Sequence, residues 1–224
     1  MVARPKSAIE RTKQTLWRAR VAVERARAGV RVRGAHNVVT FDGARVPGLD
    51  IQVLGEGNRI RIPASCYLRG LTIRVAGSHN EIVFGETVKI SLGAKLVVND
   101  DGGKLAIGHR TTMESVRLEV AGGAALSIGD DCMFAYDVDV RNTDSHSILS
   151  LSDGERLNPD ADVVIGDRVW IGAHAMVMKG TEIGHDSVVA SRAVLTRGVP
   201  PHSIAAGVPA RVVRDGIRWD RRRL

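Results

Sequence analysis

Aliphatic residues recur at every sixth position over the C-terminal part of the chain. From residue 165 onward, six consecutive hexads have an aliphatic residue first and a small or β-branched residue fifth. The first positions are Ile165, Ile171, Val177, Ile183, Val189 and Leu195, and the fifth positions are Val169, Ala175, Thr181, Ser187, Ala193 and Val199. Because a helix repeats about every 3.6 residues and a strand about every 2, a period of six predicts short strands separated by regular corners.

Three hexads make one triangular turn, so aliphatic residues three hexads apart, such as Ile165 and Ile183, are expected to stack inside a prism. The same register recurs upstream, with Ile128, Phe134 and Val140 at first positions and Cys132, Val138 and Asp144 at fifth positions. Further upstream, an Asn-x-Ile triplet that begins at Asn58 recurs at Asn80, which is a wider spacing than three hexads. We therefore predict an all-β fold, a parallel β-helix with looser coils in its N-terminal half.

A polar stretch interrupts the repeat. The turn that begins at Ile128 ends at residue 145, and the next turn begins only at Ile165, so residues 146–164 are predicted to form an extruded loop. Loops on a rigid scaffold are common places for binding and catalytic residues. We expect the β-helix to run over residues 35–200 and to carry this loop on one side.

The two ends of the chain differ from the repeat. Residues 6–28 carry a narrow apolar stripe with a heptad-like spacing, which predicts an amphipathic α-helix within a basic segment of residues 1–34. The pair Pro200-Pro201 is expected to end the prism, because proline cannot continue a strand ladder. Residues 201–224 then form a short basic tail or cap.

The composition agrees with stacked small repeats. The chain has 24 glycines but only 8 aromatic residues, too few for the core of an ordinary sandwich or helical bundle. Its two cysteines give neither a disulfide framework nor a metal-binding spacing. The first residues lack the apolar core of a secretory signal, and no stretch is apolar enough to cross a bilayer. A cytoplasmic location is therefore expected.

The net charge of +7 is concentrated at the two ends. Residues 1–34 carry +8 and residues 208–224 carry +4, so the middle of the chain carries −5. A nucleic-acid-binding protein usually has its basic residues on the folded body together with aromatic residues, and this body is acidic with few aromatics. We expect no nucleic-acid partner. The basic ends either are solvated or contact phosphates or the inner face of an anionic membrane.

The C-terminal segment resembles a known family. The segment at residues 169–214 resembles the C-terminal half of the hexapeptide-repeat O-acetyltransferases: VWIGAHAMVMKGTEIGHDSVVASRAVLTRGVPPHSIAAGVPARVVR. Residues 144–148, DSHSI, resemble the DxHSI motif of the group that modifies polysaccharides. The resemblance implies a left-handed coil, a homotrimer with sites in the clefts between prisms, acetyl-coenzyme A as the donor, and a sugar or surface-polysaccharide hydroxyl as the acceptor.

Transfer of an acyl group from a thioester to an alcohol needs a base, a donor for the developing oxyanion, and alignment of the two substrates. The resemblance matches His146 to the base, and the repeat independently places this residue between a rigid turn and the loop. A histidine has an unperturbed pKa of about 6.5 and can accept the proton near neutral pH. Asp144 or Asp139 could orient the imidazole, although Asp144 could instead cap a turn. The oxyanion donor is expected to be a backbone N–H.

The resemblance also supplies positions for the donor. The matching residues are Ala173, Ser191, Thr196, Arg197, Arg211 and Arg214. Small side chains allow the pantetheine arm to approach the backbone, and the arginines can bind phosphates. Arg192 stands where the family usually has a small residue. Trp170 occupies the usual Trp position, where it is expected to pack with one edge on the acceptor pocket.

Three other functions stay open. The same base and donor could acetylate the amine of an amino sugar. A related carbonic anhydrase group binds zinc between prisms with three histidines, for which His146, His174 and His185 are candidates, but this chain lacks the H-x4-H pair of that group and we expect no metal. The third alternative is a non-catalytic trimeric scaffold. Zinc content and acetyl-coenzyme A binding separate these functions from the O-acetyltransferase.

Overall fold

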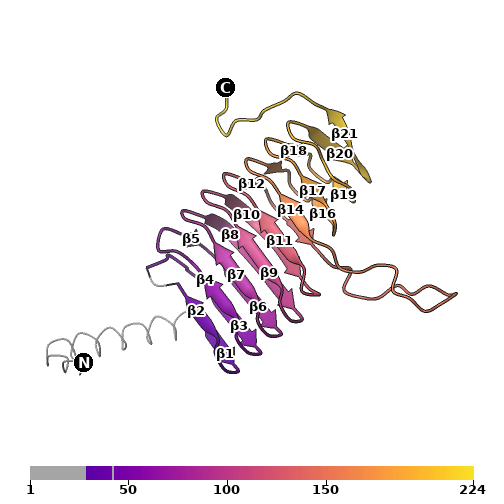
Figure 1. The fold of residues 1–224 in the computed structure, drawn as a ribbon. Coiled ribbons are helices and arrows are strands. Elements are labelled where there is room, and N and C mark those ends of the chain that lie inside the picture. The colour runs from indigo at the N-terminus through magenta and orange to yellow at the C-terminus, as the bar shows by residue number, and fades with distance from the viewer. Residues whose placement is uncertain (1–28, 42) are drawn as a thin grey trace, which may run out of the picture.

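The computed structural model describes residues 29–41 and 43–224, and every regular element within them is a β-strand. The strands stack into one long prism (Figure 1). The helix predicted for residues 6–28 lies outside the described residues. Within the described ranges, no helix is long and apolar enough to cross a membrane.

The strands form two sheets that wrap around the prism. The first has 14 strands: β1 (Val30–Arg33), β3 (Asp50–Leu54), β5 (Tyr67–Leu68), β6 (Leu71–Ala76), β8 (Lys89–Asn99), β10 (Thr112–Val120), β12 (Met133–Phe134), β13 (Val138–Arg141), β15 (Trp170–Ile171), β16 (Met176–Val177), β18 (Val188–Val189), β19 (Val194–Leu195), β20 (Ile204–Gly207) and β21 (Ala210–Arg214). The second has seven: β2 (Val38–Thr40), β4 (Arg59–Arg61), β7 (Glu81–Phe84), β9 (Lys104–Ile107), β11 (Ala125–Ile128), β14 (Val163–Ile165) and β17 (Glu182–Ile183).

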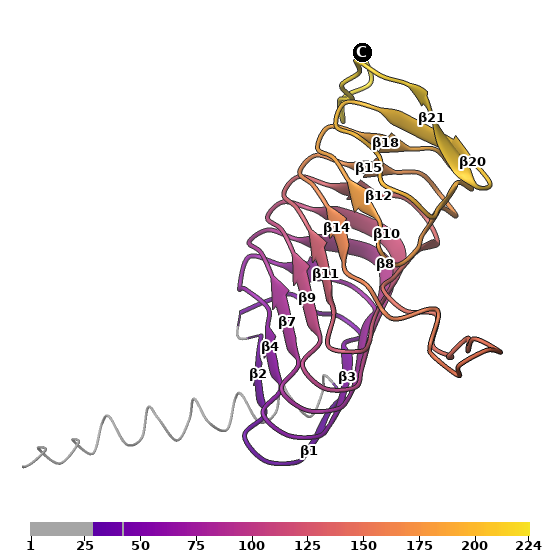
Figure 2. The same cartoon turned by 45° about the vertical axis from the view of Figure 1, so that its right-hand side comes forward.

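The larger sheet divides at the long strand β10, which pairs with both β12 and β13. From there to the C-terminus the prism has three faces. The first is β12–β15–β18, the second is β13–β16–β19, and the third is β11–β14–β17. The chain leaves β13 on the second face and re-enters the prism at β14 on the third, so the loop belongs to the corner between these two faces. The loop projects away from the stacked coils (Figure 2).

The pairing register confirms the predicted repeat. In the C-terminal coils Trp170 pairs with Val188, so one turn of the coil consists of three hexads. Ile128 pairs with Ile165, and the chain between them makes one such turn and also contains the whole loop. The upstream coils are longer than three hexads, as the pairing of Ile51 with Ile73 shows. All strand pairs are parallel except β20 with β21.

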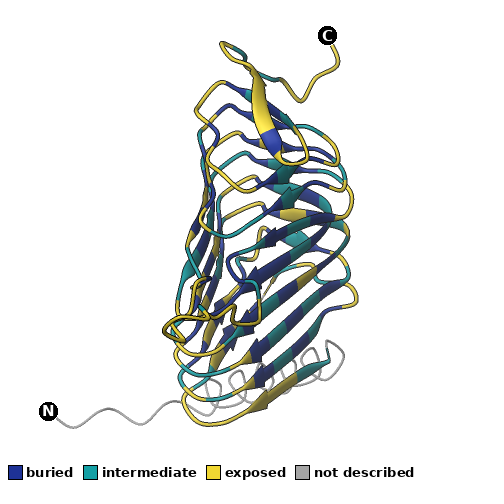
Figure 3. Cartoon of the chain, turned by 90° about the vertical axis from the view of Figure 1, so that its right-hand side faces the viewer, coloured by how far each residue is buried: buried dark blue, intermediate teal, exposed yellow. Residues whose placement is uncertain are grey.

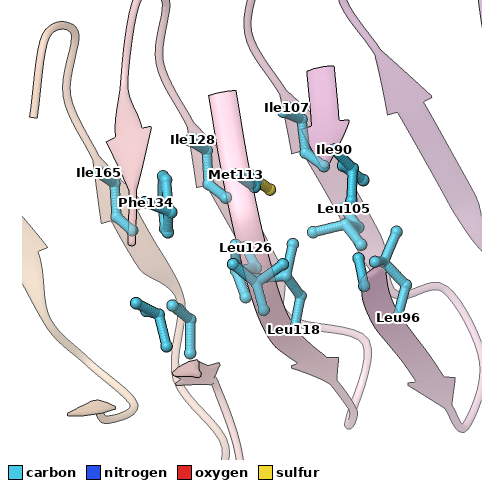
Figure 4. Close-up of a cluster of buried hydrophobic side chains, with 14 of the residues drawn as sticks. Ile90, Leu96, Leu105, Ile107, Met113, Leu118, Leu126, Ile128, Phe134 and Ile165 are labelled. Atoms are coloured by element: carbon cyan, nitrogen blue, oxygen red, sulfur yellow. The ribbon is translucent and has the colours of Figure 1, made fainter. Parts of the chain in front are cut away.

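The core is a column of hydrophobic side chains, most of them aliphatic, inside the prism (Figure 4). All six first positions of the C-terminal hexads are at most 1% exposed, and all six fifth positions are buried as well. Asp144 is an exception among the predicted inward residues, because it is only partly buried. The polar residues that point inward before the loop are Asn142 and Thr143, which are 0% and 2% exposed.

Buried asparagines stabilise one corner of the longer upstream coils. The side-chain oxygen of Asn58 accepts a hydrogen bond from the backbone N–H of Asn80 at 3.0 Å, and the side-chain oxygen of Asn80 accepts one from Gly103 at 2.7 Å. Each asparagine therefore accepts a hydrogen bond from a backbone N–H of the next coil at a corner. Without the asparagine, that buried N–H would have no acceptor. The ladder holds the longer coils in register.

The ends of the β-helix lie outside the predicted limits of 35 and 200. The first described strand starts at Val30, and β20 pairs in parallel with β18 after Pro200-Pro201. The two prolines therefore occupy a corner, and the coil continues for one more strand before β21 turns back antiparallel. The loop and the outer side of β21 are largely exposed (Figure 3).

Candidate functional site

The extruded loop is closed at its base by Asn158. This side chain donates to the backbone carbonyl of His146 at 2.9 Å and accepts from the backbone N–H of Ile148 at 2.6 Å. Asn158 is 8% exposed, so both bonds are shielded from water. Further out, Leu149 and Arg156 pair as an antiparallel bridge. The residues around His146 are therefore held as a structured hairpin.

Lys179 clamps the same region from the next coil. Its ammonium lies 2.6 Å from the Asp144 carboxylate and donates to the carbonyls of Asn158 and Pro159 at 2.8 and 2.9 Å. The hydrogen bond from Lys179, together with one from Asn158, lowers the pKa of Asp144. One cation thus joins both ends of the loop to the coil above it.

The imidazole of His146 is exposed and makes no hydrogen bond to any residue within the described ranges. Its backbone N–H donates to the Asp144 carbonyl at 2.8 Å, and Ser145 adopts a left-handed conformation with a φ of 65°. The main chain of His146 is fixed on both sides, while its ring is free to meet a substrate. Asp139 pairs with Arg141, so neither candidate aspartate contacts the ring in this chain.

A polar cleft of about 210 Å³ opens beside the loop base. Its lining residues, which we call the loop-base cleft, are Asn99, Asp100, Glu119, Ala121, Thr143, Ser145, Ser147, Arg156 and Asp160. Two ion pairs lie at it: Arg117 with Glu119 at 2.7 Å, and Arg156 with Asp160 at 3.2 Å. Sequence reasoning missed these residues, because they come from irregular coils and from the return of the loop.

The residues matched to the donor lie at several places. Thr196 and Arg197 follow β19 at the corner that also carries the loop, whereas Ala173 and Ser191 lie at the corner between the first and second faces. Arg192 lies beside Ser191 with a left-handed φ of 61°. Arg211 and Arg214 are exposed on β21.

Trp170 is 38% exposed on the first face and packs against Trp219 of the C-terminal tail, with 6.1 Å between ring centroids. The Trp219 indole N–H donates to the Arg168 carbonyl at 2.5 Å. Farther along, Arg221 donates to Thr112 Oγ1 and to the Cys132 carbonyl, both at 2.7 Å. The tail therefore lies against several coils, and Arg221 is engaged by the protein body.

A single chain does not bring His146 together with all the matched donor residues. The second face separates the corner that carries His146 from the corner that carries Ala173 and Ser191. Each side of a turn is one hexad long, or at most roughly 20 Å of extended chain. A substrate that touches both groups within one chain would have to lie across that whole face.

Within one chain, the histidines proposed for a hydratase do not converge. His146, His174 and His185 follow β13, β15 and β17 and so occupy three different corners. Within the described ranges, the side chains that could hold a metal ion are His185, Asp186 and His202, whose ligand atoms lie within 4.8 Å of one another. Arg168 binds both carboxylate oxygens of Asp186 at 2.7 and 2.5 Å and lowers its pKa to about 2. The guanidinium thus occupies the carboxylate that a cation would need.

Sequence comparison identifies the family. The family model described as bacterial transferase hexapeptide (six repeats) matches residues 162–197. The polysialic acid O-acetyltransferase of Neisseria meningitidis is 35% identical over 149 residues, which cover 66% of this chain and 68% of that protein. The chain belongs to the hexapeptide-repeat O-acetyltransferase family. The family predicted from the sequence is therefore confirmed, and the chain is an acyltransferase.

Solved structures agree with this assignment. The polysialic acid O-acetyltransferase OatWY has a TM-score of 0.83 and 31% identity, over 87% of this chain and 92% of that one. The polysialic-acid-specific acetyltransferase NeuO has a TM-score of 0.80 and 29% identity, over 86% and 88% of the two chains. The agreement covers the irregular N-terminal coils as well as the C-terminal hexads.

Proposed function

We propose that this acyltransferase moves an acetyl group from acetyl-coenzyme A to a hydroxyl of a saccharide, with His146 as the general base. The observation that carries the proposal is that His146 has a fixed backbone and an exposed ring. Its backbone is fixed by Asn158 and by the Asp144 carbonyl, its ring is exposed and makes no hydrogen bond to the described part of the chain, and its two sequence neighbours line a polar cleft. A base must be positioned accurately and must keep an open nitrogen for the incoming proton.

The reaction then proceeds by direct attack. The imidazole nitrogen of His146 takes the proton of the acceptor hydroxyl while the oxygen attacks the thioester carbonyl. A backbone N–H stabilises the resulting oxyanion. Collapse forms the ester and breaks the carbon–sulfur bond, and the imidazolium returns its proton to the leaving thiolate. No covalent acyl-enzyme is needed.

We also propose that the active unit is a homotrimer with each site shared between two neighbouring copies. The separation of His146 from Ala173 and Ser191 supports this assembly, because a second prism beside the first could bring the two groups together. The arginines at 197, 211 and 214 supply cations for the phosphates of coenzyme A. In this proposal Asp144 pairs with Lys179 and holds the loop base, a different role from the orientation of the imidazole expected from the sequence.

The direct test replaces the base. We expect His146→Ala to keep its oligomeric mass and its affinity for acetyl-coenzyme A while saccharide-dependent release of free thiol falls by roughly 10²- to 10⁴-fold. His79→Asn is the matched control, because His79 is also exposed but lies on an upstream coil, and asparagine tolerates its left-handed φ of 59°. Undiminished thiol release by His146→Ala would contradict the proposal.

A further inference from the structure

The loop-base cleft adjoins the proposed base. Ser145 and Ser147, the two neighbours of His146 in the sequence, both line it. Asn99, Asp100 and Glu119 come from the two coils below, and Arg156 and Asp160 come from the returning side of the loop. The cleft therefore borders the backbone segment that carries His146.

The size of the cleft limits what it can hold. Its volume of about 210 Å³ is smaller than the roughly 300–1,000 Å³ typical of sites for drug-sized ligands. There is room for one sugar ring. The lining consists of amide, hydroxyl, carboxylate and guanidinium groups with a single alanine, and such groups exchange hydrogen bonds with sugar hydroxyls.

The charges of the cleft are unfavourable for an anion. Three carboxylates line it, from Asp100, Glu119 and Asp160, against one guanidinium. That guanidinium is already paired with Asp160, and the nearby Arg117 is paired with Glu119. The Asp160 and Glu119 side chains are only 10% and 6% exposed, whereas Arg156 and Arg117 are 37% and 42% exposed, so an anionic ligand would have to share a guanidinium with a carboxylate that is already paired to it. Asp100 accepts a hydrogen bond from Gly122 at 3.1 Å, and no cation lies against it among the described residues.

We propose that the loop-base cleft binds the sugar residue whose hydroxyl is acetylated, and that it selects uncharged or amine-bearing residues over carboxylate-bearing ones. The inference rests on the proposed function. Carboxylate acceptors strengthen hydrogen bonds from neutral hydroxyl donors, whereas a carboxylate on the ligand meets like charge. By this chemistry the acceptor differs from polysialic acid, the acidic polymer for which the two structural relatives are named.

A matched acceptor series tests the selectivity. The purified full-length chain is assayed for acetyl-coenzyme A-dependent thiol release with the methyl glycoside of a hexose, the corresponding uronic acid, the corresponding amino sugar and a sialic acid oligomer. We expect kcat/KM for the neutral and amine-bearing glycosides to exceed that for the carboxylated ones by at least about tenfold at low ionic strength. Added salt should narrow the difference, because screening weakens exposed charges.

The variant Asp100→Asn tests whether the selectivity arises from the charge of the cleft. It removes one negative charge, keeps an oxygen acceptor for Gly122, and suits the left-handed φ of 66° at this position. The preference for the neutral glycoside should narrow by about threefold or more. Asp101→Asn is the control: it makes the same change of charge at the next residue, which binds the Ser78 backbone and does not line the cleft.

The outcomes separate this inference from the proposed function. If no acceptor supports thiol release, the proposed function fails, and saturation-transfer NMR on the same glycosides still decides whether the cleft prefers the neutral ring. Equal or better use or binding of the carboxylated glycosides overturns the inference while leaving acetyl transfer intact. An equal response of Asp100→Asn and Asp101→Asn also overturns it, because the selectivity would then arise from overall charge.

Discussion

Replacement of Lys179 by methionine should loosen the loop that carries His146 without disturbing the prism. Methionine has a similar length but cannot satisfy the Asp144 carboxylate and the carbonyls of Asn158 and Pro159. Hydrogen bonds of a charged group contribute about 1.5–3 kcal/mol, and the Lys179 side chain is 19% exposed, so we take about 2 kcal/mol for the local closing of the loop. That value increases the open population by roughly 30-fold.

Hydrogen exchange measures this change at individual amides. Protection should fall by about that factor at Ile148 and Ala161, whose N–H groups bond to Asn158 Oδ1 and to the Asn142 carbonyl. Gly166 on the coil should keep its protection. We expect kcat to fall by about tenfold or more, since a displacement of about 1 Å can lower a rate by about 10²-fold. Lys89→Met, at an exposed lysine on β8, is the control. Unchanged loop protection in Lys179→Met would refute the clamp.

Two further predictions concern the stability of the prism and the loop. In Gly129→Ala the new methyl group would lie 2.4 Å from the Asp167 carboxylate and 2.7 Å from the Gly166 carbonyl carbon of the next coil, so we expect a loss of at least about 2 kcal/mol in urea unfolding. In the control Gly154→Ala the new methyl group meets nothing within 4 Å, so the unfolding free energy should fall only by the roughly 1–2 kcal/mol that a left-handed backbone costs alanine. Equal losses of stability in the two variants would contradict the close stacking of the coils. The pKa of Asp144 is lowered in the folded state, so its pairing with Lys179 stabilises the protein above about pH 3.9 and is lost as the pH falls through the folded value. The difference in unfolding free energy between wild type and Lys179→Met should therefore be constant above about pH 5 and shrink below about pH 4, and a difference that persists at low pH would argue against this assignment.

The repeat was predictable because each hexad places the same kind of side chain in the same environment. One aliphatic residue per face and one small residue per corner are short-range requirements, so they are visible along the sequence. The register also located the loop, since Ile128 and Ile165 stack one turn apart and the residues between them in excess of three hexads must be extruded. The prediction that Pro200-Pro201 ends the prism was wrong, because a corner of the prism accommodates both prolines and the strand ladder resumes at β20.

The contacts around the site were not predictable for a different reason. Lys179 reaches Asn158 from the following coil, and Arg221 of the tail reaches Thr112 near the middle of the chain. Such contacts depend on which corners lie above one another once the coils have unequal lengths, and the outward side chains involved follow no period. The sequence suggested that the basic tail is either solvated or bound to phosphates or a membrane, whereas Trp219 and Arg221 bind it to the coils.

Mixing two inactive variants tests most directly whether His146 of one copy serves a donor held by another. His146→Ala lacks the base, and Ser191→Trp blocks the exposed corner matched to the pantetheine arm. When the two are unfolded and reassembled together in equal amounts, about one quarter of the interfaces in a cyclic trimer should combine an intact base with an intact donor corner. The shared site predicts that thiol release recovers toward a quarter of the wild-type rate. If the mixture stays as inactive as either variant alone although mixed oligomers form, the shared site is contradicted.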